Sequence, residues 1–117
     1  MSYLDAMIAA VPTAKKEAYL AHARQAAELF RRHGALEVAE CWGADVPDGK
    51  LTSFPLAVRK ADDETVVLSW IRWPSKPARD AAWHAIEADA AMGALFAAMP
   101  FDGARLVHGG FDVVLDA

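Results

Sequence analysis

Three residues with acid–base chemistry interrupt apolar runs of the sequence, where a titratable side chain is unusual. Asp5 stands in the run YLDAMI, and Glu40 and His108 stand in two further apolar segments. A carboxylate buried in such a setting has a raised proton affinity unless a partner compensates it, and proteins make general acids and bases in this way. The commoner outcome is structural pairing, with Arg72, with a backbone amide or across a subunit interface. Asp5, Glu40 and His108 are therefore candidate catalytic residues, with pairing as the alternative.

Aromatic residues in the same segments suggest a second kind of chemistry, the binding of a planar ligand. The residues expected to contact such a ligand are Trp42, Trp70, Arg72 and Phe111. Pockets for small molecules are mostly apolar, as a wall of aromatic rings would be. Packing in the hydrophobic core is the alternative, because aromatic rings supply much of the buried area of a small protein.

The histidines do not form a metal-binding pattern. They are His22, His33, His84 and His108. None has a cysteine or carboxylate at zinc-like spacing, and Asp80 with His84 would supply only two ligands one helical turn apart. Cys41 is expected to be a small core residue rather than a nucleophile. Because a glycine-rich phosphate loop is also missing, we expect neither a metal nor a cofactor.

The charge and the distribution of apolar residues exclude several classes of partner. Twelve Lys and Arg residues against sixteen Asp and Glu residues give a net charge of −4, whereas nucleic-acid binding needs a basic surface. The cations at Arg31 and Arg32 are explained by the end of a helix. No run approaches the roughly 18 to 20 apolar residues of a membrane span. With a single cysteine and no secretion leader, the expected location is the cytoplasm.

Hydrophobic periodicity predicts four strands and two helices. The strands are Tyr3–Val11, Leu36–Trp42, Val66–Trp73 and Arg105–Leu115; the helices run from the N-cap Thr13 to Gly34 and from Ser75 to about Ala91, before a break at Gly93. Residues 52–59 contain a proline and are either an edge segment or a short helical turn. Gly109 and Gly110 indicate a bulge, or a close approach by another backbone or a ligand.

The order β-α-β-β-α-β indicates an α+β fold, the ferredoxin-like sandwich, with an antiparallel sheet and both helices on one face. Residues 1–117 are expected to form one domain. Alternation along the strands is poor, however, so both faces of the sheet are apolar. One helical layer buries only one of them, and we expect the other to pair with a second copy of the chain.

Several turn-bounded segments carry a resemblance to a known family. They are ECWGADVPDGK, TSFPLAV, LSWIRWPSK, MPFDG and GGF, between residues 40 and 111. Together they resemble the YbaA-like proteins, a group of unknown function in the dimeric α/β-barrel superfamily. The resemblance implies a homodimer that pairs its sheets across a two-fold axis. It leaves two functions open: binding of a small apolar or aromatic ligand between sheet and helices, or cofactor-independent catalysis of the monooxygenase or isomerase type using a buried carboxylate or histidine.

Overall fold

Four antiparallel strands form one sheet at the centre of the molecule. The computed structural model describes all residues from 1 to 117. The strands are β1 (Tyr3–Pro12), β2 (Glu37–Trp42), β3 (Glu64–Trp73) and β4 (Val107–Asp112). They lie in the order β2-β3-β1-β4, so the two longest strands, β1 and β3, occupy the centre of the sheet. All four predicted strands are confirmed, with ends that shift by a few residues.

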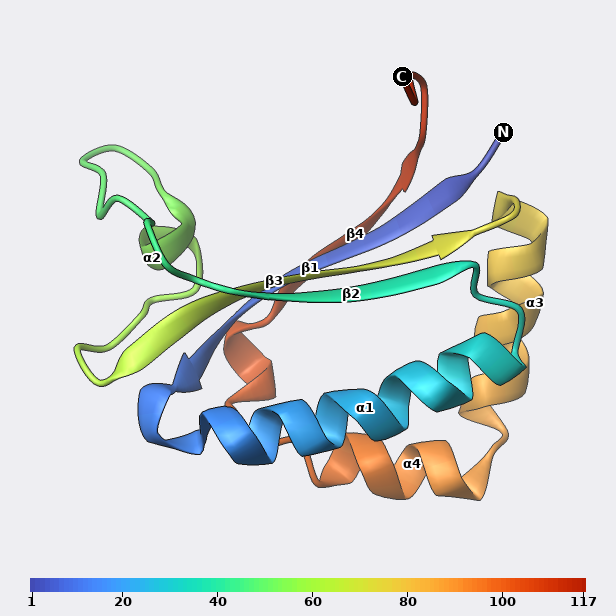
Figure 1. Ribbon diagram of the computed structural model, residues 1–117, viewed down its shortest axis with the longest axis horizontal. Coiled ribbons are helices and arrows are strands. Elements are labelled where there is room, and N and C mark those ends of the chain that lie inside the picture. The colour runs from blue at the N-terminus through green and yellow to red at the C-terminus, as the bar shows by residue number, and fades with distance from the viewer.

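The helices divide unequally between the two faces of this sheet (Figure 1). The helices are α1 (Lys16–Arg32), α2 (Phe54–Ala57), α3 (Lys76–Glu87) and α4 (Ala90–Ala97), with short 3-10 turns η1 (Thr13–Lys15) and η2 (Gly103–Arg105). Helices α1, α3 and α4 cover one face, whereas the short α2 lies over one end of the other face. None of these helices combines the length and the apolar composition needed to cross a lipid bilayer.

A third helix on the covered face is a departure from the predicted two. The chain breaks at Asp89 rather than at Gly93, because the Asp89 carboxylate accepts a hydrogen bond from the amide of Ala91 at 2.9 Å and starts α4. Gly93 lies within α4, and a Cβ atom there would meet no other atom within 4 Å. An aspartate that caps a new helix therefore outweighs the helix-weakening effect of one glycine.

Two further local predictions are settled by hydrogen bonds. Thr13 does not cap α1; its hydroxyl lies 2.7 Å from that of Thr65, and the η1 turn leads into the helix instead. Residues 52–59 contain the predicted short helical turn, because the Ser53 hydroxyl accepts a hydrogen bond from the Leu56 amide at 3.0 Å. That hydroxyl caps α2 and satisfies one of its free amides.

The glycines of β4 do not form a bulge. The register with β1 is continuous, with Ala6 opposite Gly109 and Asp5 opposite Gly110. A Cβ atom at Gly110 would lie 2.3 Å from the Tyr3 hydroxyl oxygen, so the glycine makes room for a neighbouring tyrosine ring. The close approach that the paired glycines indicated therefore comes from a side chain of the same sheet.

Strand pleating separates the residues of the two faces. The odd-numbered residues of β1 and β3 point toward the helices, and the even-numbered residues point away. The largest fully buried side chains include Ile71 and Trp73 of β3, Ile86 of α3 and Met92 of α4. The main core thus lies between the sheet and the helical layer, toward the end of the sheet that α3 covers.

Asp5 is the polar centre of this core. Only 6% of the residue is exposed, and its carboxylate accepts hydrogen bonds from the indole nitrogens of Trp73 and Trp83, each at 2.9 Å. Arg79 of α3 donates to it from Nη2 at 2.8 Å and from Nε at 3.1 Å. The guanidinium also lies 5.3 Å from the centre of the Tyr3 ring. One carboxylate therefore connects β1, β3 and α3.

A second buried carboxylate fastens the opposite end of the sheet. Glu64, at the start of β3, receives two hydrogen bonds from Arg105 of η2 at 2.8 and 2.7 Å and one from the Ala61 amide at 2.7 Å. Arg105 also donates to the Arg59 carbonyl at 2.9 Å. These bonds, those from Arg105 first, lower the pKa of Glu64 to about 2. Glu64 and Arg105 therefore hold η2, which precedes β4, against the segment between α2 and β3.

The Asp5 network makes a quantitative prediction. The Asp5→Ala variant leaves a half-buried guanidinium and two indole N–H groups without their acceptor in the core, so the free energy of unfolding should fall by about 3–5 kcal/mol. Asp80→Ala is the matched control, because Asp80 binds the same Arg79 from an exposed position and its loss should change the free energy of unfolding far less. Urea unfolding followed by tryptophan fluorescence measures both. Equal losses in the two variants would contradict the assignment.

Candidate functional site

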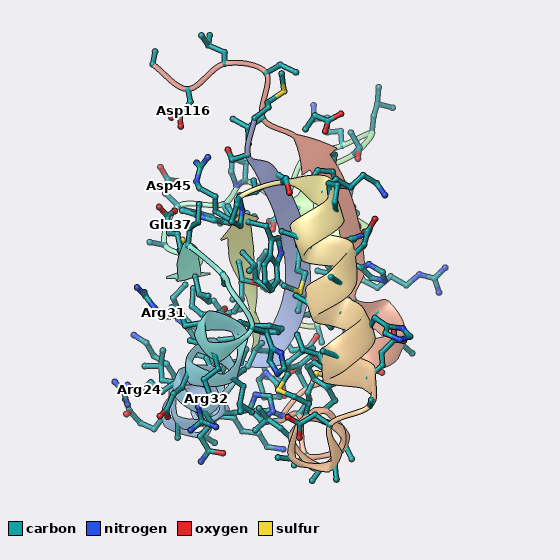
Figure 2. The ribbon with its side chains drawn as sticks, turned by 90° about the vertical axis from the view of Figure 1, so that its right-hand side faces the viewer. Arg24, Arg31, Arg32, Glu37, Asp45 and Asp116 are labelled. Atoms are coloured by element: carbon teal, nitrogen blue, oxygen red, sulfur yellow. The ribbon has the colours of Figure 1, made fainter.

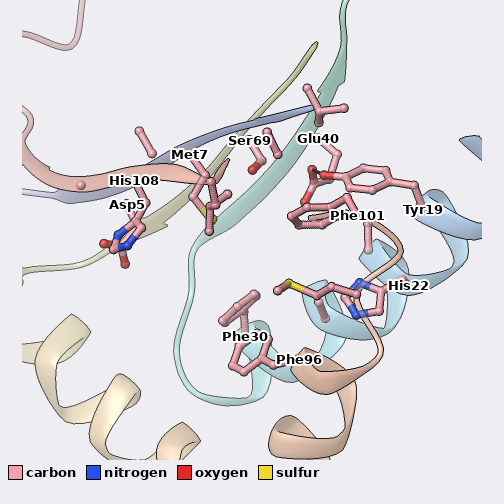
Figure 3. A pocket seen from close by; sticks show the side chains of 18 of the residues that line it. Asp5, Met7, Tyr19, His22, Phe30, Glu40, Ser69, Phe96, Phe101 and His108 are labelled. Atoms are coloured by element: carbon pink, nitrogen blue, oxygen red, sulfur yellow. Dashed lines mark hydrogen bonds between the residues drawn. The ribbon is translucent and has the colours of Figure 1, made fainter. Parts of the chain in front are cut away.

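A cavity of about 420 Å³ lies between the sheet and the helical layer (Figure 3). Its volume is within the range of pockets that hold small organic ligands. Thirteen of its twenty lining residues are hydrophobic, and they include Met7 from β1, Phe30 from α1, Phe96 from α4 and Phe101 from the segment before η2. Arg79 and Trp83 of α3 line it as well, so the wall is built by the sheet, three helices and the connection to β4.

A row of side chains crosses the sheet beneath this cavity. Glu40 of β2 pairs with Ser69 of β3, Ser69 pairs with Met7 of β1, and Met7 pairs with His108 of β4. All four residues line the cavity. Because neighbouring strands lie about 4.8 Å apart, Glu40 and His108 are separated by roughly 14 Å. They cannot share one proton, but they can contact opposite ends of one ligand.

Glu40 is held by a tyrosine from α1. The Tyr19 hydroxyl donates a hydrogen bond to Oε2 of Glu40, and the two groups point toward each other in Figure 3. Glu40 is exposed to solvent on the outer strand β2, but the side of its carboxyl that faces the cavity is partly desolvated. This desolvation raises the pKa of the carboxyl, while the bond from Tyr19 and the nearby His22 oppose that rise. Burial, with the Glu40 charge as the next cause, also raises the pKa of Tyr19. The Glu40 carboxyl therefore takes up a proton at a higher pH than an ordinary surface glutamate does.

Ser69 is the polar group that the protein leaves without a partner. The residue is 7% exposed, and its hydroxyl makes no hydrogen bond with the rest of the chain. No fully enclosed polar side-chain atom of the protein lacks a partner, so this hydroxyl opens onto the cavity, as Figure 3 shows. Buried hydroxyls are normally paired with protein or with bound molecules. The position therefore provides one free donor and acceptor for a ligand.

The histidines beside the cavity have different roles. Nε2 of His22 lies 2.7 Å from the Leu95 carbonyl oxygen and connects α1 to α4. His108 is exposed at the outer strand β4 and has no hydrogen-bond partner in the protein. Nowhere in the chain do three or more His, Cys, Asp or Glu side chains gather as they would around a metal ion.

The three candidate catalytic residues all line the cavity, but their environments differ. Asp5 is fully occupied by Arg79 and two indoles, which is the structural pairing that the sequence left as an alternative. Its cationic partner is Arg79 of α3 rather than Arg72. Glu40 and His108 keep polar atoms that no other group of the protein uses. Of the three candidates, Glu40 and His108 are therefore the ones that can still bind a ligand or exchange a proton with it.

None of the four expected ligand contacts lines this cavity. Trp70 and Arg72 are even-numbered residues of β3, and Phe111 of β4 lies opposite Leu4, so all three point away from the helices. Trp42 is on the helix side, with its ring centre 6.2 Å from that of Tyr19, but it packs behind the tyrosine rather than against the cavity. Strand pleating, which reverses direction at each residue, explains the difference.

Sequence reasoning missed Tyr19, His22, Ser69 and Arg79. Tyr19 lies on the helix face predicted for α1, and His22 follows it by three residues, so helical spacing offered a signal that the two are neighbours. Ser69 interrupts an apolar strand in the same way as Asp5 does. Arg79 lies 74 residues from Asp5, and no sequence pattern connects the two.

The outer surface of the helical layer carries charge without forming a site. Figure 2 shows Arg24, Arg31 and Arg32 on the outer side of α1, away from the sheet. Arg31 and Arg32 belong to the last turn of α1, where cations interact favourably with the free carbonyls, as expected from the sequence.

Comparison with known proteins identifies relatives over nearly the whole chain. The model of a family described as "Protein of unknown function (DUF1428)" matches residues 2–103. The uncharacterized protein YbaA of Escherichia coli strain K12 is 48% identical over 116 residues, which cover 99% of each chain, and YbaA of Shigella flexneri matches to the same extent. The resemblance to YbaA-like proteins is thereby confirmed. The chain belongs to the DUF1428 family of proteins of unknown function.

Proposed function

We propose that this protein binds a small apolar or aromatic molecule in the cavity between the sheet and helices α1 and α4. The observation that carries this proposal is the Ser69 hydroxyl, which is buried, without a protein partner and open to a cavity of about 420 Å³. A cavity of this volume in a close-packed protein forfeits contacts among its lining side chains. A ligand would restore those contacts and satisfy the hydroxyl.

The shape of the lining supports an aromatic or aliphatic ligand body. Phe30, Trp83 and Phe96 pack at one side, with the Trp83 and Phe96 rings stacked at 6.1 Å, and Phe101 stands at the other side. Such rings favour offset or edge-on contacts with a planar guest. The polar groups lie in the row across the sheet, so a ligand would place its polar atoms toward the strands and its apolar body toward the helices.

We further propose that the chain adopts the ferredoxin-like sandwich and forms a homodimer through its other sheet face. That face carries exposed apolar residues from the central strand β3 to the outer strand β4: Leu68 is 37% exposed, Val107 is 44% exposed and Phe111 is 55% exposed. Helix α2 covers only one end of it, through the cluster of Ala10, Val58 and Val66. A continuous apolar surface of this kind is typical of a subunit interface.

A second copy of the same chain is the occupant that best fits this face. Glu37 and Arg72 lie opposite each other on β2 and β3, so the face presents both signs of charge beside its apolar centre. A surface with both signs can be complementary to itself under a two-fold rotation. In this arrangement Trp70, Arg72 and Phe111 would serve the interface rather than the ligand.

A second candidate function, acid–base catalysis without a cofactor, rests on Glu40. Its carboxyl has a raised pKa, is oriented by Tyr19 and faces an apolar cavity, which are the features of a general base. The ligand recovered from the native protein should then be converted by the wild type and left unchanged by Glu40→Gln, as followed by mass spectrometry. If His108→Gln converts the ligand as fast as the wild type does, His108 is not required for the catalysis. Conversion that survives Glu40→Gln would contradict catalysis by Glu40.

Filling the cavity should abolish ligand binding. Ala26 of α1 lines the cavity, so Ala26→Phe places a ring inside it and should weaken the binding of N-phenyl-1-naphthylamine, a neutral fluorescent probe, by more than about tenfold. The control is Ala21→Phe, the same change at an exposed position of the same helix, which should leave binding intact. Fluorescence titration measures both. The proposal fails if the wild type does not bind the probe or if both variants bind it equally.

A charge on the bare sheet face should dissociate the dimer. Phe111→Lys would bury an unpaired ammonium group from each chain in the proposed interface, so the mass measured by light scattering after gel filtration should fall from that of two chains to that of one. Arg31→Glu, on the outer side of α1, should leave the mass unchanged. A wild-type protein that is monomeric at micromolar concentration would refute the dimer outright.

A further inference from the structure

One oxygen of the Glu40 carboxylate is left without a partner. Oε2 accepts the bond from Tyr19, whereas Oε1 accepts no hydrogen bond from the protein. No lysine, arginine or histidine lies within ion-pair distance of either oxygen. The Tyr19 hydroxyl donates a hydrogen bond to this carboxylate, so the ionised form of Glu40 presents Oε1 to the cavity as a free acceptor. Glu40 stands exposed on the outer strand β2, so this end of the cavity is open to solvent.

The other titratable groups that line the cavity do not cancel this charge. Asp5 and Arg79 neutralise each other through two hydrogen-bonded contacts at the α3 end. His22 lies near Glu40 and lowers the pKa of that carboxyl, but it forms no ion pair with it, because its Nε2 is engaged with the Leu95 carbonyl. His108 lies at the opposite end of the polar row. The end of the cavity beside Glu40 therefore offers free acceptors and no ion-paired cation.

Ser69 stands beside Glu40 and completes a small polar recess. The two residues are directly paired in the register of β2 and β3, and their side chains point to the same face of the sheet. Paired side chains on adjacent strands are about 5 Å apart, so one polar head group can reach both. The recess contains a charged acceptor at Glu40 Oε1 and a hydroxyl that both accepts and donates at Ser69.

We propose that this recess selects small apolar ligands with a hydrogen-bond-donating head, a hydroxyl or an amine N–H, and rejects carboxylates. The donor would bind Glu40 Oε1, and the Ser69 hydroxyl would contact the same head group. A carboxylate placed there would meet the like charge of Glu40 and find no ion-pair partner to offset it. This inference rests on the proposed function, because it concerns the ligand of the same cavity.

Three compounds with one ring system test the inference. They are naphthalene, 2-naphthol and 2-naphthoate, which share an apolar body and differ in the head group. At pH 7 the wild type should bind 2-naphthol about tenfold more tightly than naphthalene, since a hydrogen bond to a charged acceptor is among the stronger ones. It should bind 2-naphthoate more weakly than naphthalene. Competition against the fluorescent probe N-phenyl-1-naphthylamine gives the three affinities on one scale.

Two variants connect this order of affinities to the recess. Glu40→Gln removes the charge, so it should reduce the preference for 2-naphthol and improve the binding of 2-naphthoate without changing that of naphthalene. Ser69→Ala should weaken 2-naphthol without admitting 2-naphthoate. The matched control is Glu37→Gln, on the same strand but on the opposite face, where Glu37 accepts a bond from the Trp70 indole at 2.6 Å; it should leave all three affinities unchanged.

The outcomes separate this inference from the proposed function. If none of the three compounds binds, the binding function itself fails. If naphthalene binds but 2-naphthoate binds as tightly as 2-naphthol, the cavity stands and the preference for donors is overturned. The same conclusion follows if Glu40→Gln retains naphthalene binding and the order of the three affinities. If Glu40→Gln loses naphthalene binding through misfolding, the Ser69→Ala result decides, and an unchanged affinity for 2-naphthol would overturn the recess.

Discussion

The carboxylate of Asp5 is the interaction on which the arrangement of this protein depends. A charge in an apolar interior is stable only when each of its lone pairs has a donor, and here the donors come from two indoles and a guanidinium. Because Trp73 belongs to β3 and both Arg79 and Trp83 belong to α3, the bonds set the position of that helix at one end of the sheet. Helices α1 and α4 meet each other at the opposite side through His22 and the Leu95 carbonyl. The space between these two attachments is the cavity, and the row from Glu40 to His108 forms its floor.

Much of the fold was accessible from local sequence patterns, since each of those patterns depends on neighbouring residues. Strand β3 is rich in β-branched and aromatic residues and stops before Pro74, and the helical spacing of Tyr19, Ala23 and Phe30 identified α1. The same patterns missed α4 because a glycine in an alanine-rich segment suggested a break, while the capping by Asp89 was not recognised. The contact of Glu64 with Arg105 was also beyond reach, because the two residues are 41 positions apart.

Only part of the candidate site can be predicted from the sequence, because the sequence alone does not tell to which face of the sheet a side chain points. A polar residue in an apolar strand is a signal for a functional position, and that signal found Asp5, Glu40 and His108, all of which line the cavity although only Asp5 is buried. It does not tell which face of the sheet receives an aromatic residue until the register is known, so Trp70 and Phe111 were assigned to the ligand although they lie on the bare face. The partners of the polar groups, Tyr19 for Glu40 and Arg79 for Asp5, come from helices and depend on tertiary packing.

The central claim is that the cavity is a binding site in a two-chain assembly. Native mass spectrometry of the protein, purified gently from its own host, tests it most directly because one spectrum reports both the assembly and any retained molecule. The account predicts the mass of two chains plus a defined additional mass that disappears when the protein is denatured. A spectrum of single chains without additional mass, obtained under conditions that preserve known dimers and their ligands, would contradict it.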